Sequence, residues 1–519
     1  MAGRVVKAVF GVAGILLVSR LLGFFREVII ADIFGTSAQY DLYLVAIMLP
    51  ALLSGVLSFA SIYLFVPYLS AKAKHSTDGE ITIDWPSIRP AINLAKTSAL
   101  IMALAIIFLA PYIMKIWGSN YSGEDFGLIV FYCRLTAFMV VLGVTEAFMR
   151  AFLNVKRIFT YPASGYIVYN VTCILAIVFL NKQLSVGAIA VGMMGGLIIQ
   201  NIYLLVRIMG YHPFKGLHLK LIDDDSRAIL ATGGIIILIE FINRSYFLID
   251  RYVAPQFGEG VISALNYGQV LIQLPDSIIG LAIGAVVFPM FSQASNDAQD
   301  NKFGDVYRKA ITSAILIAIP IAAFYLINAE DLVHLLFQRG QFDQASVTLT
   351  AAILKPYAPS IIALFVISTS IRACYSGGWG KYVLVFAAVI FATKFVGTFV
   401  LAKIFGYAGI TAATSLAHIG FASFMLIFLT KKVPATVNVR FVWNIVMLLL
   451  IGLVTVLSAY YLKTYISGYL DSSDITGVII KLLVLGVFVL VVYLLGVYFM
   501  GLKSVLAISL QRSPRTTDE

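Results

Sequence analysis

The sequence predicts an all-α polytopic membrane protein. The chain has 519 residues, of which 60% are hydrophobic and only 12% are charged, and its mean hydropathy is +0.94. Soluble domains are about 25% charged and 45–50% apolar. A soluble chain of this composition could not bury all of its apolar side chains. The composition therefore excludes a soluble enzyme, a disordered chain and a secreted disulfide-rich scaffold.

Long apolar segments predict fourteen membrane-spanning helices, because a helix needs about 20 mostly apolar residues to cross the hydrocarbon core. The segments are residues 8–31, 38–70, 92–117, 126–153, 160–181, 186–209, 227–252, 260–293, 307–328, 343–374, 381–402, 407–430, 439–463 and 475–501. The first segment lacks a small-residue cleavage site, so we interpret it as a helix and not as a signal peptide. Prolines at positions 50, 275, 320 and 356 predict bends within these helices.

The net charge of +11 is explained by the loops, which follow the positive-inside rule. If the N-terminus is inside, the cytoplasmic segments carry Arg4, Lys7, Lys72, Lys74, Arg89, Lys156, Arg157, Lys215, Lys220, Arg227, Lys302, Arg308, Lys309, Lys381, Lys431, Lys432, Arg440, Lys503, Arg512 and Arg515. The opposite loops are poor in basic residues or acidic, as at Glu124-Asp125 and Glu330-Asp331. The alternation predicts that both termini are cytoplasmic, and the surplus charge requires no nucleic-acid partner.

The two halves of the chain share a pattern that predicts an internal duplication. Phe34-Gly35 precedes Leu49-Pro50 in the first half, and Phe257-Gly258 precedes Leu274-Pro275 in the second. An even number of helices separates the copies, so the repeats are parallel. We expect two six-helix lobes related by a pseudo-twofold axis along the membrane normal. The lobes are residues 1–209 and 227–432, joined by a cytoplasmic linker at 210–226 and followed by a helix pair and tail at 433–519.

Ionisable side chains within the first predicted helix are candidate substrate-binding residues, because such groups are costly in a membrane and normally face a cavity or a partner. This helix carries Arg20, Arg26 and Glu27. Arginine binds phosphate groups through planar bidentate hydrogen bonds. The excess of arginine on this helix points to an anionic substrate.

Three further charged residues are candidates for coupling or gating. Glu240 and Arg244 are four residues apart on the seventh predicted helix, which is the spacing of an intrahelical ion pair. Lys394 lies near the middle of the eleventh. A lysine there could replace a bound cation as the positive charge of a coupling site. It could equally snorkel or join the lobes by a salt bridge, and the sequence leaves these alternatives open.

No catalytic or metal-binding constellation is expected. Cys133, Cys173 and Cys374 each lie inside an apolar segment and have neither zinc nor redox spacing. Only His334 has an acid at helical spacing, Glu330, and a single external pair is not the constellation that an integral-membrane transferase would need. We therefore expect a transporter without a cofactor, coupled to the membrane potential, Na+ or H+.

The first two predicted helices resemble the MurJ/MviN family. The matching residues are Ser-Arg-Leu-Leu-Gly-Phe-Phe-Arg-Glu at 19–27, Ile-Phe-Gly at 33–35, Asp41, Leu49-Pro50 and Phe-Val-Pro at 65–67. Leu153-Asn154, Phe159, Pro162 and Asn170 are similar to the family's connection between helices four and five, and Leu-Phe-Gln-Arg-Gly-Gln-Phe at 336–342 to a short external segment. These proteins are flippases for lipid II, the undecaprenyl-pyrophosphate-linked peptidoglycan precursor, within the superfamily of multidrug and oligosaccharidyl-lipid exporters.

The resemblance implies a function and a set of substrate-binding residues. The family's first-helix arginines fall at Arg20 and Arg26 with Glu27 following, its acidic residue on helix two falls at Asp41, and Arg251 matches an arginine on helix seven. The resemblance further implies a monomer in the bacterial cytoplasmic membrane. It would carry a lipid-linked glycan among membrane lipids by alternating access, from the cytoplasmic to the outer leaflet.

Departures from the family pattern leave other substrates open. The family's lysine before Leu-Pro on helix two is Met48 here, and its helix-two glutamate falls near Ser58 or Phe59. Charged residues of the family's helix eight are replaced by Gln269, Val270 and Gln273. Part of the cationic cavity expected for lipid II is therefore missing. We expect a lipid II flippase. The alternatives are a flippase for another lipid-linked oligosaccharide, of the exopolysaccharide or O-antigen type, and a cation-coupled drug exporter.

Overall fold

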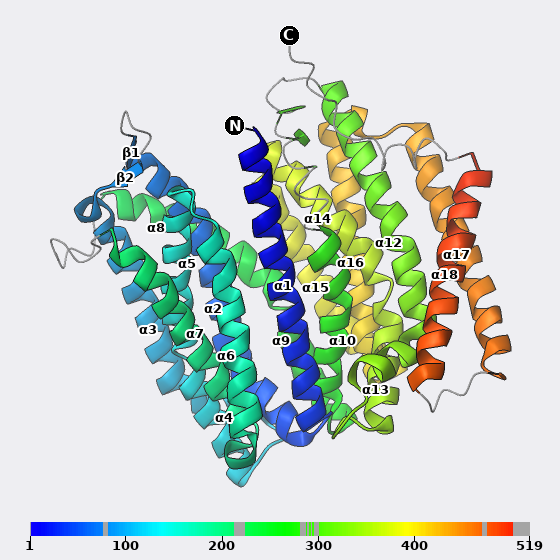
Figure 1. The fold of residues 1–519 in the computed structure, drawn as a ribbon, viewed down its shortest axis with the longest axis horizontal. Helices are drawn as coiled ribbons and strands as arrows, with labels where there is room; N and C mark the ends of the chain where they lie inside the picture. Colours follow the sequence, from blue (N-terminus) through cyan, green and yellow to red (C-terminus); the bar gives the residue numbers. More distant parts are fainter. Residues whose placement is uncertain are drawn as a thin grey trace. The chain divides into compact units, whose positions relative to one another are not determined.

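The protein consists of long helices in a computed structural model (Figure 1). The structure describes residues 2–75, 81–211, 224–280, 300–469 and 475–501, together with positions 287, 290, 291, 293 and 294. Its described residues fall into two compact units, Met1–Ser263 and Ala264–Glu519, which we call unit 1 and unit 2. Each unit is described by itself.

Unit 1 contains nine helices and a small hairpin among its described residues. The helices are α1 (Ala2–Phe34), α2 (Ala38–Lys72), α3 (Trp85–Trp117), α4 (Gly123–Thr136), α5 (Met139–Val155), α6 (Thr160–Leu184), α7 (Gly187–Met209), α8 (Asp224–Arg244) and α9 (Tyr246–Val253). Helix α6 packs against α1 and α7, and α2 packs against α5 and α8. A single turn of 3-10 helix at Ala254–Phe257 follows α9, and α10 (Val261–Pro275) begins at the end of this unit.

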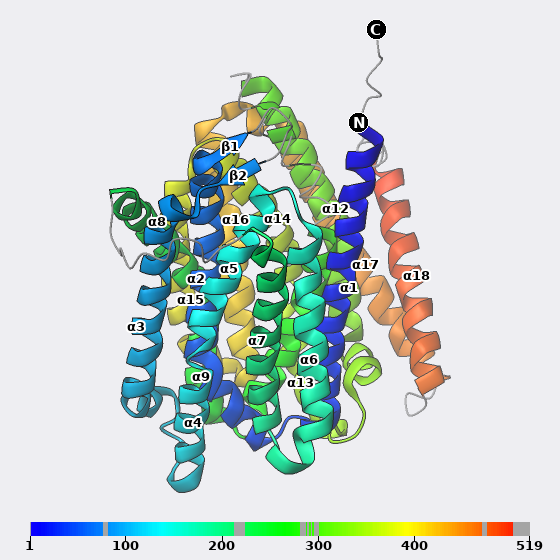
Figure 2. The same ribbon diagram turned by 60° about the vertical axis from the view of Figure 1, so that its left-hand side comes forward.

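The connection between α2 and α3 differs from the expected loop at 71–91. It forms a two-stranded antiparallel hairpin of β1 (Ala73–His75) and β2 (Ile81–Ile83). Helix α3 then begins at Trp85, several residues before the predicted position 92. The early start has a local cause, because Pro86 occupies the first turn, where its missing N–H is not needed. Figure 2 shows the hairpin at the end of unit 1 where α2 ends and α3 begins.

Unit 2 is also helical. Its described helices are α12 (Asp300–Phe337), α13 (Gln344–Tyr357), α14 (Ser360–Ser376), α15 (Gly380–Phe405), α16 (Tyr407–Lys432), α17 (Val439–Ile466) and α18 (Ile475–Phe499), with a 3-10 turn at Pro434–Thr436. Helix α12 packs against α13, α14, α17 and α18, while α15 and α16 pack along each other. Most of the predicted segment 260–293 beyond Gly280 lies outside the described residues.

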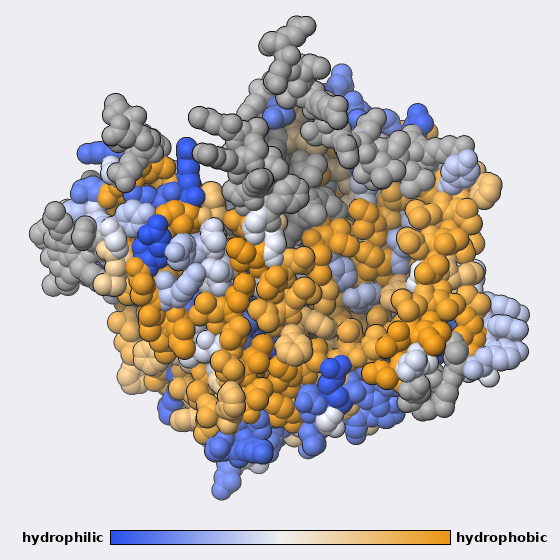
Figure 3. All heavy atoms as spheres, viewed as in Figure 1, coloured by the Kyte–Doolittle hydropathy of each residue, from blue (hydrophilic) through white to orange (hydrophobic). Residues whose placement is uncertain are grey.

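The predicted class, an all-α polytopic membrane protein, is confirmed. Ten helices among the described residues are long and apolar enough to cross a membrane, or eleven if the bent pair α13 and α14 is one span. The expected total of fourteen remains a prediction. Figure 3 shows apolar side chains covering the helices, with hydrophilic side chains gathered at the ends. Exposed apolar residues such as Phe108 and Phe179 suit contact with lipid.

A helix ends at or next to two of the four predicted prolines, and the structure gives a bend at one of them, Pro356. Helix α10 ends at Pro275, where a π-helical turn begins, and α13 ends one residue after Pro356, at a bend of 49°. Helix α2 continues through Pro50. In α12 the non-helical residue is Asn328 and not Pro320. A proline removes one backbone hydrogen bond, and packing against neighbouring helices can hold such a helix together.

Candidate functional site

Arg26 on α1 is held by two side chains, one on its own helix and one on α6. Its Nη2 lies 2.7 Å from Oε1 of Glu27, and its Nε also donates to that oxygen at 3.3 Å. Its Nη1 donates to Oδ1 of Asn170 at 3.2 Å. A guanidinium has five N–H groups, and these contacts occupy three of them.

Asn170 and Tyr169 on α6 fix the position of this guanidinium. Asn170 donates to the backbone carbonyls of Ser19 and Tyr166, at 3.3 and 3.0 Å, which orients its carbonyl oxygen toward Arg26. The Tyr169 ring centroid lies 5.6 Å from the Arg26 guanidinium carbon, within cation–π range. Both the Arg26 and Glu27 side chains are mostly buried, at 17% and 11% exposed. The pair is therefore a rigid, preorganised group.

Arg20 is exposed on the same helix and supplies the unneutralised charge of this region. It interacts electrostatically with Tyr166 of α6, the helix that carries Asn170. Arg26 is balanced by Glu27, and Arg20 has no carboxylate partner among the described residues. The two predicted arginines therefore differ: Arg26 is fixed and Arg20 is available.

A second polar network on α5, α6 and α7 lies beside this pair and was not predicted as a site. Glu146 is buried and accepts from Arg150 and from Nε2 of Gln200, each at 3.3 Å. Arg150 also donates to the hydroxyl of Tyr166, and its guanidinium carbon lies 4.8 Å from that ring centroid. The four-residue spacing of Glu146 and Arg150 predicts the ion pair. Its link through Tyr166 to the helix that contacts α1 depends on the tertiary fold.

Asp41 is buried, and its carboxylate caps the start of α10. One oxygen accepts from the backbone N–H of Gly260 at 2.6 Å, and the other accepts from the backbone N–H and the hydroxyl of Ser263. Helix N-termini present unsatisfied N–H groups and favour a negative charge. The structure thus engages both Asp41 oxygens with the backbone near Val261.

Arg251 on α9 is bonded to the backbone of α2. Its Nη1 donates to the carbonyl of Leu44 at 2.6 Å, and its guanidinium carbon lies 4.9 Å from the Phe247 ring centroid. Leu44 is three residues from Asp41. Asp41 and Arg251 therefore both connect the first turns of α2 to the segment from α9 to α10.

The predicted pair of Glu240 and Arg244 is present on α8. Arg244 donates to Glu240 and is half-exposed, while Glu240 is buried. The Arg244 guanidinium carbon lies 5.9 Å from the Phe59 ring centroid on α2. The side chain passes over Gly55, where an added Cβ would come within 3.2 Å of its Nη1. The pair therefore packs on α2 at a point opened by a glycine.

Lys394 lies in unit 2 and is fully buried. Its Nζ donates to the backbone carbonyl of Ile410 on α16 at 3.0 Å, and Thr414 donates to the same oxygen at 3.1 Å. His418, one turn further along α16, interacts with it electrostatically. The Lys394 amino group is thus held between α15 and α16.

The described residues contain no group of three His, Cys, Asp or Glu side chains placed to hold a metal ion. The three cysteines are buried and unpaired by disulfides. The guanidinium groups of Arg20 and Arg26 are chemically suited to binding anionic groups.

Comparison with known proteins relates the chain to one transporter family. The family model described as lipid II flippase MurJ matches residues 30–488. The lipid II flippase MurJ of Burkholderia cenocepacia is 26% identical over 427 residues, covering 78% of this chain and 80% of that protein. A probable lipid II flippase MurJ of Bdellovibrio bacteriovorus is 26% identical over 441 residues, covering 83% of each.

Solved structures give the same fold. The lipid II flippase MurJ in an inward closed conformation aligns with a TM-score of 0.78 and 20% identity, over 95% of this chain and 99% of that one. An inward-facing multidrug resistance MATE family transporter of the MOP superfamily aligns with a TM-score of 0.66 and 14% identity, over 82% and 98% of the two chains. At these identities the match establishes the arrangement of helices.

Proposed function

The chain belongs to the MurJ family of lipid II flippases, a family of membrane transporters and not of enzymes, and we propose that it moves lipid II across the membrane. One observation supports the proposal most directly. A preorganised Arg26 and an exposed Arg20 lie on the same helix, within unit 1. Lipid II carries a pyrophosphate, and guanidinium groups are suited to its oxygens.

The two arginines have different roles in the proposed mechanism. Arg26 is already oriented by Glu27 and Asn170, and it presents its remaining N–H groups without a further entropy cost. Arg20 is free to move and neutralises the remaining phosphate charge. Arg150, held by Glu146 and Tyr166, adds a further guanidinium, already ion-paired, on α5. Transport then follows by alternating access, with release of the headgroup at the opposite face.

The environment and energy source are also part of the proposal. The protein would act as a monomer in the bacterial cytoplasmic membrane with both termini in the cytoplasm. The buried Lys394 ammonium would supply the positive charge that a coupling cation would otherwise bring. The membrane potential would then drive flipping without a bound Na+ or H+, since moving one charge is worth about 2.3 kcal/mol per 100 mV.

The carboxylates that a drug exporter would need are already engaged in this protein, which argues against that function. A cation exporter requires carboxylates that are free to bind its substrate. Glu27 is paired with Arg26, and both Asp41 oxygens accept hydrogen bonds at the start of α10.

The missing family cations favour a second candidate function, a flippase for another lipid-linked oligosaccharide. Met48 stands where the family usually has a lysine, and Val270 stands where it usually has an arginine, so each of these positions lacks a cation. The pyrophosphate would be the same, and the glycan would differ.

Complementation distinguishes these functions. The cell's own lipid II flippase is depleted, this chain is expressed, and growth is measured together with lipid II accessible from outside. We expect rescue by the native sequence and by Lys115→Ala, which removes an exposed cation at the far end of α3. We expect Arg20→Ala and Arg26→Ala to fail at equal expression. Failure of the well-expressed native chain would exclude lipid II and leave the other glycans, and activity of both arginine variants would exclude the assigned site.

A further inference from the structure

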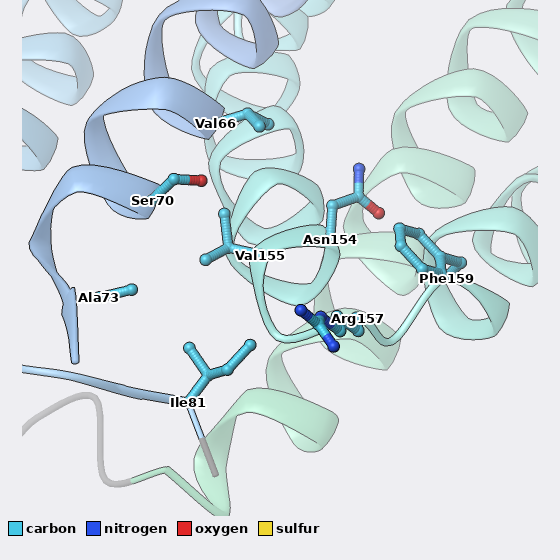
Figure 4. Close-up of a pocket in the computed structure, with 8 residues that line it drawn as sticks. All are labelled: Val66, Ser70, Ala73, Ile81, Asn154, Val155, Arg157 and Phe159. Carbon is cyan, nitrogen blue, oxygen red and sulfur yellow. The ribbon is translucent and has the colours of Figure 1, made fainter. Parts of the chain in front are cut away.

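A pocket at the hairpin end of unit 1 contains none of the residues that we assign to the substrate site. Its volume is about 460 Å³, and it lies where α2, β1 and β2 meet the end of α5 and the start of α6 (Figure 4). Its apolar wall includes Val66, Val155 and Phe159, and its polar side chains are Ser70, Asn154 and Arg157. Pockets of roughly 300–1,000 Å³ hold small ligands. The size and the mixed lining suit a ligand with a polar and an apolar part.

The polar groups of the pocket are available for a ligand. Within the described part of the chain, the side chains of Ser70, Asn154 and Arg157 make no hydrogen bond or ion pair. The neighbouring Lys156 is engaged, since it donates to the carbonyl of Ile81 and lies 4.3 Å from the ring centroid of Tyr211. Figure 4 shows Ser70 on one side of the pocket and Asn154 and Arg157 on another. These groups are donors, and the guanidinium is cationic.

The backbone conformation at position 157 favours glycine over arginine. Arg157 has a φ of +59°, in the left-handed region. The N–H of Ile158 bonds to the carbonyl of Leu153, and that of Arg157 bonds to the carbonyl of Asn154, each at 2.9 Å. This is the Schellman motif that ends many helices, and its left-handed position is usually glycine. The chain thus places an arginine, with its side chain in the pocket, where glycine would fit the backbone better.

We propose that this pocket binds the phosphate of an anionic membrane lipid. The Arg157 guanidinium binds two phosphate oxygens, Ser70 and Asn154 donate to the headgroup, and the wall at Val66 and Phe159 contacts the first carbons of the lipid. The place is suited to a headgroup, because hydrophilic side chains gather at this end of unit 1 and apolar side chains cover the helices beside it (Figure 3). Basic pockets between membrane helices bind anionic headgroups in this way.

Two lysines lie next to the pocket in the sequence, and neither of them lines it. Lys72 and Lys74 flank Ala73, which lines the pocket. Soluble phosphate would use the same donors, but it would gain nothing from the apolar wall. The proposal therefore commits to the lipid, and it is independent of which glycan the protein transports.

Lipid binding by the purified full-length protein tests the proposal. Native mass spectrometry measures retention of phosphatidylglycerol and of zwitterionic phosphatidylcholine. We expect selective retention of phosphatidylglycerol, and about a tenfold weaker affinity in Arg157→Gln, because a charge-assisted bidentate contact is lost. Lys74→Gln is the matched control. It removes an exposed positive charge beside the pocket without changing its lining, and we expect less than about a twofold effect.

A second variant separates lipid binding from folding. Arg157→Gly removes the guanidinium and relieves the left-handed backbone, so its melting temperature should equal or exceed that of the native protein while phosphatidylglycerol binding falls. Three results would overturn the proposal. They are native-like phosphatidylglycerol binding by both Arg157 variants, equal retention of the two lipids, and displacement of phosphatidylglycerol by inorganic phosphate at equal affinity, which would identify a soluble ligand.

Discussion

At the scale of single residues, Asn170 determines how Arg26 is presented. It accepts from the guanidinium and anchors itself to two backbone carbonyls. Asn170→Ala should lower the rate of lipid II flipping about tenfold at equal expression, because the guanidinium loses an orienting hydrogen bond worth about 1.5 kcal/mol. Flipping measured in reconstituted vesicles checks this. Arg26→Lys should also flip lipid II more slowly than the native protein, since an ammonium cannot make the same planar contacts. A native flipping rate in either variant would contradict the argument.

The position of Asp41 predicts a structural effect of its replacement. Asp41→Ala removes the acceptor for two buried N–H groups at the start of α10, so it should destabilise the fold by about 2 kcal/mol. Asp41→Asn, which keeps one carbonyl oxygen, should cost less. Thermal unfolding of the purified variants measures both. An unchanged melting temperature together with abolished flipping would instead place Asp41 in direct contact with the substrate.

Some of these contacts are predictable from the sequence, and others are not. The ion pair of Glu240 and Arg244 follows from its four-residue spacing, because helix geometry alone brings the side chains together. The partners of Asp41 lie 219 and 222 residues away and are set by the tertiary fold. Asn170 could be recognised only as part of a family pattern, and no local rule connects it with Arg26.

At the scale of elements, the close packing of α6 on α7 supports the site on α1. An added Cβ at Gly196 would lie 2.9 Å from the Tyr169 carbonyl oxygen and 3.0 Å from the sulfur of Cys173. Gly192 and Gly196 are four residues apart on α7, and small residues at this spacing let membrane helices approach each other closely. Tyr169 also stacks on Arg26. The spacing of the glycines predicts helix contact, while the link to Arg26 depends on the position of α1.

Gly196→Ala should therefore reduce both stability and flipping, because the backbone of α6 must move and Tyr169 moves with it. The expected loss is about 1–3 kcal/mol, measured as a lower melting temperature, with a severalfold slower flipping rate. Gly195→Ala is the matched control, since its added Cβ would meet only Thr172 at 4.0 Å. Equal effects of the two substitutions would show that close approach at Gly196 is not what matters.

At the scale of the whole molecule, hydropathy predicts the class, and packing decides the details. Composition alone indicates a helical membrane protein because every backbone polar group in the hydrocarbon core must be paired within its own segment. The bend between α13 and α14 lies within one apolar segment that hydropathy predicts as a single span, 343–374. The hairpin of β1 and β2 was not predicted, because its strands are only three residues long.

The buried Lys394 leads to a prediction about how the whole protein is driven. If its fixed ammonium replaces a bound cation, exchanging Na+ for choline should leave lipid II flipping in reconstituted vesicles unchanged, within about twofold. Collapse of the membrane potential should slow it about tenfold. Lys394→Met should slow flipping, and Lys403→Met, which removes an exposed lysine from the same helix, should not. A native protein that stops when Na+ is withdrawn would show that a bound ion, and not Lys394, carries the coupling charge.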